Sequence, residues 1–114
     1  MPDNIFTKII AKQIPAKIVY EDERALAFRD IKPVAPVHVL VVPKSEIADV
    51  AAARAEDESL LGHLLTVAAK VARQEGISNT GFRLVINNGR DAGQLVPHLH
   101  VHVLGGRAME WPPG

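Results

Sequence analysis

Residues 98–104 read His-Leu-His-Val-His-Val-Leu, so that histidine alternates strictly with an apolar residue. In a β-strand, successive side chains point to opposite faces. The segment therefore predicts a strand with its three histidines on one face and its apolar residues packed into a core on the other. Each imidazole carries two nitrogens that need polar partners, so a row of three is a poor way to fill a core. The pattern thus predicts a polar site on one face of a sheet.

Four more segments favour strands, and two favour helices. β-branched and aromatic residues bounded by charged turns or prolines predict strands at residues 17–20, 25–28, 38–42 and 82–87. A short helix, capped by Asp3 or Asn4 and ended before Pro15, precedes them. A long helix opens at residues 56–58 and carries leucine, valine and alanine at three- and four-residue spacing as far as Gly76. We expect an α+β fold: a five-stranded antiparallel sheet with one long and one short helix.

Length and charge narrow the class of protein. The chain has 114 residues, which predicts a single domain over residues 1–114, with residues 105–114 as a C-terminal tail. Thirteen basic and thirteen acidic residues give no net charge, which argues against nucleic acid or an anionic membrane as a partner. Without cysteine there is neither a disulfide nor thiol chemistry. The first twenty residues do not resemble a signal peptide, and we expect a cytoplasmic protein.

The histidine row favours phosphoryl or nucleotidyl transfer. Imidazole titrates near neutral pH, so it can attack phosphorus, exchange protons or bind a phosphate oxygen. A covalent nucleotidyl-imidazole intermediate divides one difficult hydrolysis into two easier steps. Metal chelation is the alternative, because three neutral imidazoles can form a catalytic zinc site. The row spans about 13 Å in a straight strand, too far for all three rings to reach one ion, so we expect no metal and no cofactor.

The pattern His-φ-His-φ-His-φ-φ, with φ apolar, is the signature of the histidine triad (HIT) family, and the chain matches it at every position. The resemblance extends to the Hint branch, the histidine triad nucleotide-binding proteins, which are purine nucleoside phosphoramidases. It is carried by further segments along the chain, among them residues 14–17 (IPAK), 57–64 (DESLLGHL) and 105–114 (GGRAMEWPPG).

This resemblance implies a homodimer whose two five-stranded sheets join into one. It implies a hydrolase for purine nucleotide conjugates, in which AMP or GMP is bonded to an amine, and for aminoacyl-adenylates. His100 would attack the α-phosphorus and expel the amine, and water would then release the nucleotide. His102 would bind a non-bridging phosphate oxygen. His98 and His38 would hold the imidazoles in their working tautomers.

The resemblance also implies a nucleotide pocket. Asp30 would bind the ribose hydroxyls, although an aspartate at this place also suits a turn cap. The apolar base slot and the phosphate contacts would come from Ile5, Phe6, Phe28, Ile31, Leu40, Asn87, Gly93, Gln94 and Leu95. Leu95 departs from the small hydroxyl residue that relatives often carry near the leaving group. Trp111, in the C-terminal tail, would help to select the substrate.

Two other functions fit the sequence. One is a nucleotide-binding regulatory protein whose turnover is incidental, and the other is a dinucleotide polyphosphate hydrolase. Retention of the middle histidine favours an enzyme, and the Trp-Pro-Pro-Gly ending argues against the polyphosphate branch. The remaining histidine of the chain, His63, lies in the predicted long helix, and we interpret it as structural.

Overall fold

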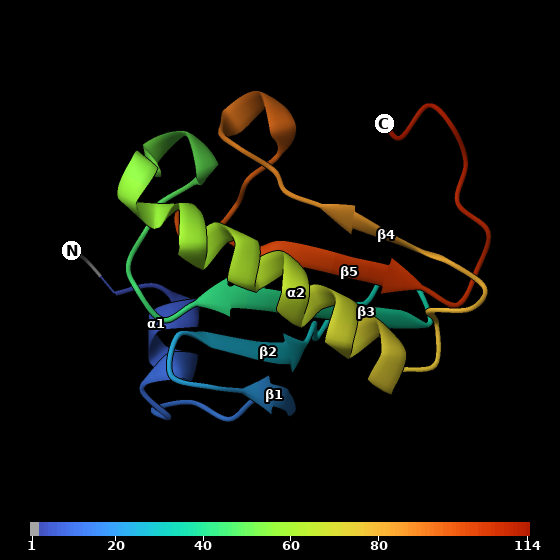
Figure 1. The fold of residues 1–114 in the computed structure, drawn as a ribbon, viewed down its shortest axis with the longest axis horizontal. Coiled ribbons are helices and arrows are strands. Elements are labelled where there is room, and N and C mark those ends of the chain that lie inside the picture. Colours follow the sequence, from blue (N-terminus) through green and yellow to red (C-terminus); the bar gives the residue numbers. More distant parts are fainter. Residues whose placement is uncertain (1–2) are drawn as a thin grey trace.

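The computed structural model describes residues 3–114, and its centre is one antiparallel sheet (Figure 1). The strands are β1 (Ile18–Glu21), β2 (Ala25–Arg29), β3 (Val37–Pro43), β4 (Phe82–Val85) and β5 (Val101–Gly105), in the spatial order β1-β2-β3-β5-β4. The helices are α1 (Ile5–Ile10) and α2 (Glu58–Gln74), and three short 3-10 turns occupy Val50–Ala52, Ala55–Asp57 and Arg90–Ala92. The predicted α+β architecture, with five strands, one long and one short helix, is confirmed.

The two helices begin and end where local chemistry places them. The side chain of Asn4 accepts hydrogen bonds from the backbone N–H groups of Phe6 and Thr7, which makes it the N-cap of α1. In the long helix, Glu75 is the C-cap of α2, and Gly76 follows with a φ of +76°. That left-handed conformation suits glycine, and it ends the helix at the predicted residue.

The sheet is covered on both faces, which explains the nearly unbroken apolar runs of its inner strands. Alternate residues of β2 and β3 point to the two sides. Ala25, Ala27, Val39 and Val41 pack with α2, while Leu26, Phe28, Leu40 and Val42 pack with Phe6 and Ile9 of α1. Phe6 and Ile9 are the buried residues of α1, whereas Ile5 is 45% exposed. Because α1 has only six residues, it covers only part of the sheet face on which it packs.

The histidine strand is shorter at its start than residues 98–104 suggest. β5 pairs with β3 only as far as Val101 opposite Val41. Pro43, at the end of β3, has no N–H to donate, and its carbonyl accepts a hydrogen bond from His98 Nε2 at 2.9 Å. The backbone N–H of Leu99 turns to the carbonyl of Ile47 instead. Residues 98–100 therefore lie outside the ladder of the sheet and are held by other hydrogen-bond partners.

The predicted alternation nevertheless holds through this segment. Leu99, Val101 and Val103 are buried in the cluster beneath α2. On the opposite side, the rings of His98 and His100 contact Phe6 edge-on, with ring centroids 6.1 and 5.0 Å apart. β4 ends at Val85, so Asn87 lies in the following loop and not in a strand. Among residues 3–114, no helix has both the length and the apolar character to cross a membrane.

Candidate active site

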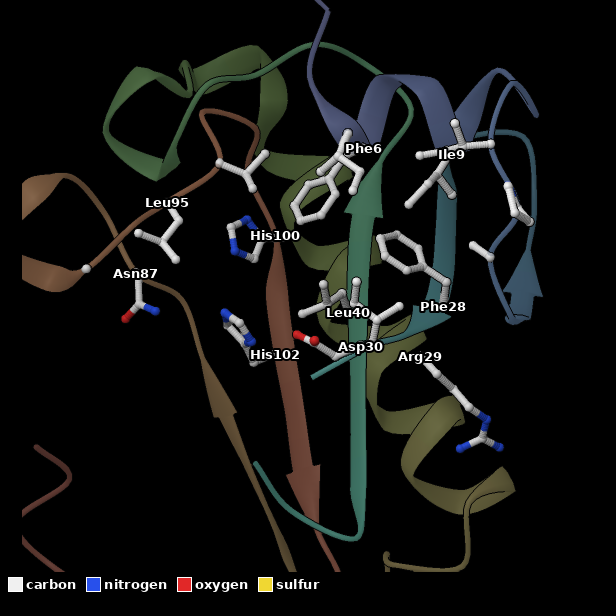
Figure 2. Close-up of a pocket in the computed structure, with 17 residues that line it drawn as sticks. Phe6, Ile9, Phe28, Arg29, Asp30, Leu40, Asn87, Leu95, His100 and His102 are labelled. Carbon is white, nitrogen blue, oxygen red and sulfur yellow. The ribbon is translucent and has the colours of Figure 1, made fainter. Parts of the chain in front are cut away.

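A cavity of about 440 Å³ opens between α1 and the sheet, beside the histidines (Figure 2). Its volume lies in the range of small-molecule sites, roughly 300–1,000 Å³. Figure 2 shows His100 and His102 on the β5 segment, with Asn87 and Leu95 on one side of them and Phe6, then Phe28 and Ile9, on the other side. Eleven residues named from the sequence line this cavity: Ile5, Phe6, Phe28, Asp30, Ile31, Leu40, Asn87, Gly93, Leu95, His100 and His102.

The sequence missed part of the apolar end. The wall there also includes Ile9, Ile14, Pro15, Ala16, Arg29 and Val96. Ile9 could have been found, because it follows Phe6 by one helical turn and shares its face. Ile14 to Ala16 belong to a loop that returns from α1 to the sheet, and no periodicity marks that return. Arg29 is anchored by Glu75, the C-cap of α2, with 2.9 Å between Nη2 and Oε2.

His100 is held in one tautomer. Its Nδ1 lies 2.7 Å from the carbonyl oxygen of His98. A carbonyl can only accept, so Nδ1 must carry the hydrogen, and this assignment follows from the partner. Burial, together with the charge of nearby His98, lowers the pKa of His100, although the bond to the His98 carbonyl works in the opposite direction. In the neutral ring, Nε2 therefore keeps its lone pair.

His102 is fixed by a chain of two hydrogen bonds. The backbone N–H of Val34 donates to His38 Nδ1 at 3.1 Å, so His38 carries its hydrogen on Nε2. His38 Nε2 then lies 2.9 Å from His102 Nδ1 and donates to it. Neutral His102 must consequently carry its own hydrogen on Nε2. Burial first, and then the charges of His100 and His38, lower the pKa of His102 to about 4, so this ring is neutral at pH 7.

Asp30 stands at the margin of this histidine pair. One of its carboxylate oxygens accepts a hydrogen bond from the backbone N–H of Lys32 at 2.8 Å, so Asp30 does cap a turn. The other oxygen lies 3.4 Å from His38 Nε2. Burial lowers the pKa of His38, and the charge of Asp30 partly offsets that effect. The carboxylate also lines the cavity, where its remaining lone pairs can meet a ligand.

Asp30, His38 and His102 also form the group of possible metal ligands found among residues 3–114. One donor atom from each lies within 4.8 Å of the others. This differs from the trio that the sequence raised, since His98 and His100 are not part of it. The two nitrogens of the group already share a hydrogen bond, so an ion would have to displace the bridging proton.

Four predicted site residues do not line the cavity. His38 acts through His102, as described above. His98 is buried, with its ring bonded to Pro43 and its carbonyl to His100. The side-chain amide of Gln94 is engaged with the backbone of Gly89, Ala48 and Val96.

Trp111 is 82% exposed and lies outside the cavity of its own chain. Its tail instead follows β4, where Arg83 donates to the carbonyl of Glu110 at 2.9 Å. The tail therefore does not bring the indole to the histidines within one chain.

His63 lies in α2, away from the cavity. Its Nε2 is 2.6 Å from an oxygen of Asp22, in the turn between β1 and β2. Although burial alone would raise it, the pKa of Asp22 is held well below its usual range by hydrogen bonds from the backbone of Arg24 and Ala25, the hydroxyl of Tyr20 and His63. The hydrogen bond between His63 and Asp22 joins α2 to the sheet, which fits the interpretation of His63 as structural.

Comparisons with known proteins all point to one family. The model of the HIT domain matches residues 11–109. An uncharacterised HIT-like protein of Synechococcus elongatus is 57% identical over 112 residues, which cover 98% of this chain and 97% of that protein. The structure of a HIT family hydrolase from Legionella pneumophila matches with a TM-score of 0.96 and 48% identity, over 98% of this chain and all of that one. A histidine triad nucleotide-binding protein from Candida albicans matches with a TM-score of 0.81 and 31% identity, over 95% of this chain and 82% of that one.

Proposed function

The chain belongs to the HIT family, and from this premise we propose that it hydrolyses purine nucleotide conjugates, cleaving the P–N bond of AMP- or GMP-amines and the P–O bond of the mixed anhydride in aminoacyl-adenylates. The observation that carries the proposal is the pair of fixed tautomers. His100 presents a lone pair on Nε2, and neighbouring His102 presents an N–H, with the two ring centroids 4.9 Å apart. A nucleophile beside a hydrogen-bond donor is what transfer at phosphorus requires.

In the first step, the lone pair of His100 Nε2 attacks the α-phosphorus. The P–N bond breaks, its electron pair goes to nitrogen, and the amine leaves with one proton taken from solvent. The imidazole becomes positively charged while it holds the nucleotidyl group. The His98 carbonyl, bonded to Nδ1–H, stabilises that charge, because a hydrogen bond strengthens as its donor becomes cationic.

In the second step, water attacks the same phosphorus, and the bond between phosphorus and His100 Nε2 breaks. The lone pair returns to the ring, the nucleoside monophosphate leaves, and water releases the proton that the first step consumed. Throughout, the Nε2–H of His102 donates to a non-bridging oxygen. His102 can do so as a neutral ring, because its pKa is lowered to about 4.

The rest of the cavity fits the remainder of a nucleotide. The apolar end between Phe6, Phe28 and Leu40 suits a flat purine, and the carboxylate of Asp30 suits the paired hydroxyls of ribose. Asn87 and the backbone of Gly93 stand near the phosphate end. Each of these assignments is part of the proposal.

We also propose that two copies pair along the edge of the sheet formed by β4. Phe82 and Ile86 there are 36% and 40% exposed, and Leu65 on the outer side of α2 is 48% exposed. Exposed apolar side chains beside an edge strand are typical of a surface that another chain covers. Trp111 keeps its proposed role in substrate selection by reaching the cavity of the other copy. Sedimentation of the protein over a range of concentrations tests the pairing, and a monomer throughout contradicts it.

The activity is tested with a fluorogenic adenosine 5′-phosphoramidate, following amine release by the wild type and His100→Ala. We expect turnover at neutral pH that survives a chelator and disappears in the variant. If the wild type binds AMP but releases no amine, the protein is a nucleotide-binding module, and the enzymatic proposal is wrong. Turnover that a chelator abolishes would instead assign the chemistry to a metal at Asp30, His38 and His102.

A further inference from the structure

A second cavity, of about 470 Å³, adjoins the phosphate end of the first. The two share Gly93 and Leu95 as wall residues. Leu95 is 92% exposed, so its side chain stands between the cavities without being packed into either. Asp49, Arg90 and Pro97 also line the second cavity.

Hydrogen bonds between two loops build this second cavity. The amide of Gln94 donates to the carbonyl of Ala48 at 2.8 Å and accepts from the backbone N–H of Gly89 at 2.8 Å. The backbone N–H of Ala51 donates to Asn88 Oδ1, also at 2.8 Å. Residues 48–51 and 88–94 are thereby tied together, and the space between them is a feature of the fold.

The connectivity of the proposed substrate directs its leaving group to this place. Base, ribose, phosphorus and amine follow one another in the conjugate. With the base among Phe6, Phe28 and Leu40 and the phosphorus at His100, the amine continues away from the base, past Leu95. Another cavity, lined by Lys17, Arg29 and Ile31, also adjoins the first, but it does so at the ribose and base end.

The charges around the second cavity are unequal in effect. Arg90 pairs with Asp91 at 3.0 Å, and the two side chains are 93% and 91% exposed. Solvent therefore screens both charges, and they largely cancel each other. Asp49 is half buried, and one of its oxygens is fixed by the backbone N–H of Ala52 at 2.9 Å, where it caps the turn Val50–Ala52. The carboxylate of Asp49 is the charge with a fixed position in this wall.

We propose that the second cavity receives the amine leaving group, and that Asp49 makes it selective for amines that carry a further positive charge. The inference rests on the proposed function, since it assigns the other half of that substrate. The class of ligand is a diamine or a comparable cationic amine, joined to the nucleotide through one nitrogen. Its distal ammonium donates to the carboxylate of Asp49, while its carbon chain passes along Leu95 and Pro97.

The test uses three adenosine 5′-phosphoramidates whose amines are ammonia, butylamine and putrescine. Butylamine and putrescine have the same carbon chain, and only putrescine places an ammonium beyond Leu95. We expect kcat/KM for the putrescine conjugate to exceed that for the butylamine conjugate about fivefold at low salt, and less at high salt. The ammonia conjugate is too short to enter the second cavity, so it reports the chemistry at His100 alone.

Asp49→Asn separates charge from structure, because asparagine is as good an N-cap as aspartate. We expect this variant to lose the preference for putrescine over butylamine and to keep its rate on the ammonia conjugate. Arg90→Gln is the matched control in the same wall, and we expect it to keep the preference within about twofold. Because the two amines differ in basicity, the decisive quantity is the change in their ratio between the wild type and Asp49→Asn.

An unchanged ratio in Asp49→Asn overturns the inference, whatever the absolute rates. A protein that turns over none of the three conjugates fails the proposed function instead. The affinities of the uncleaved conjugates, measured by calorimetry, then decide the question: a preference for putrescine that Asp49→Asn removes supports the site, and equal affinities overturn it.

Discussion

Two histidines of this chain each stand beside a carboxylate, one at the cavity and one away from it. His38 lies 3.4 Å from Asp30, and His63 lies 2.6 Å from Asp22. At Asp22, the hydroxyl of Tyr20 and two backbone N–H groups join His63, so the carboxylate is surrounded by donors from its own fold. At Asp30, the carboxylate accepts one backbone N–H and has its other oxygen beside His38, at the edge of a space large enough for a ligand.

The comparison shows that a histidine–aspartate pair has no fixed meaning by itself. The two pairs differ in what the neighbouring hydrogen-bonding groups bind. Around Asp22 they are used within the fold, and the result is a joint between α2 and the sheet. Beside Asp30, hydrogen bonds run from the backbone N–H of Val34 to His38 and from His38 to His102. They leave the Nε2–H of His102 available at the cavity. We expect chemistry where a hydrogen-bonding group stays available to a ligand.

Replacing one histidine in each region should give the widest separation. His100→Ala removes the nucleophile, and we expect kcat for an adenosine phosphoramidate to fall by about a thousandfold or more. His63→Ala removes a structural partner, and kcat measured well below its unfolding temperature should change by less than about threefold. Steady-state kinetics on both variants provide the measurement. Comparable losses of kcat would mean that the two regions are not functionally distinct.

A variant of His38 sharpens the same comparison within the site. His38→Ala removes the Nε2–H donor that fixes His102, although it leaves both cavity histidines in place. We expect kcat to fall by about 10- to 100-fold, the loss usual for a residue that orients a catalytic group, while the affinity for AMP changes little. Turnover kinetics and AMP titration check this. An unchanged kcat would show that His102 holds its tautomer without His38.

The joint around Asp22 should appear in stability and not in rate. Asp22→Asn weakens hydrogen bonds to a charged acceptor, and we expect the free energy of unfolding to fall by about 1–2 kcal/mol. Since the folded pKa of Asp22 lies below its unfolded value, the stabilisation is present above the unfolded pKa and is lost as the pH falls through the folded one. Urea unfolding at neutral pH measures the loss, with Asp30→Asn as the matched variant at the cavity.

The pH dependence of stability offers the most specific contrast. The folded pKa of His102 is lowered to about 4, so between the unfolded value near 6.5 and pH 4 the unfolded chain binds the extra proton. The stability gained from keeping this ring neutral is therefore complete above about pH 6.5 and is lost progressively down to about pH 4. We expect His102→Asn to flatten this part of the stability profile relative to the wild type. Identical profiles for the two proteins would contradict the assignment of a neutral, buried His102.

The sequence predicted the part of the site that follows from a strand's two faces. The alternation of residues 98–104 separated the histidines from the apolar residues correctly, even though the ladder of β5 begins only at Val101. That late start depends on Pro43 and on Ile47, which are distant in sequence and leave no periodic signal.

Other features were beyond any local pattern. The contact of Asp30 with His38 crosses a proline-rich loop, and the wall formed by Ile14 to Ala16 depends on how the chain returns from α1. The tautomers of His100 and His102 depend on backbone carbonyl and amide groups, whose positions are set only by the folded sheet. The sequence therefore predicted most of the residues that meet at the cavity, and the structure supplied the orientations from which the proposed chemistry is argued.

The stereochemical course at phosphorus tests the central claim most directly. A phosphoramidate made chiral by sulfur at the α-phosphorus is hydrolysed in isotopically labelled water, and the configuration of the labelled nucleoside thiophosphate is determined. Attack by His100 followed by attack by water inverts the phosphorus twice, so the account predicts net retention. Net inversion would mean that water displaces the amine directly, and that His100 does not form the covalent intermediate proposed for it.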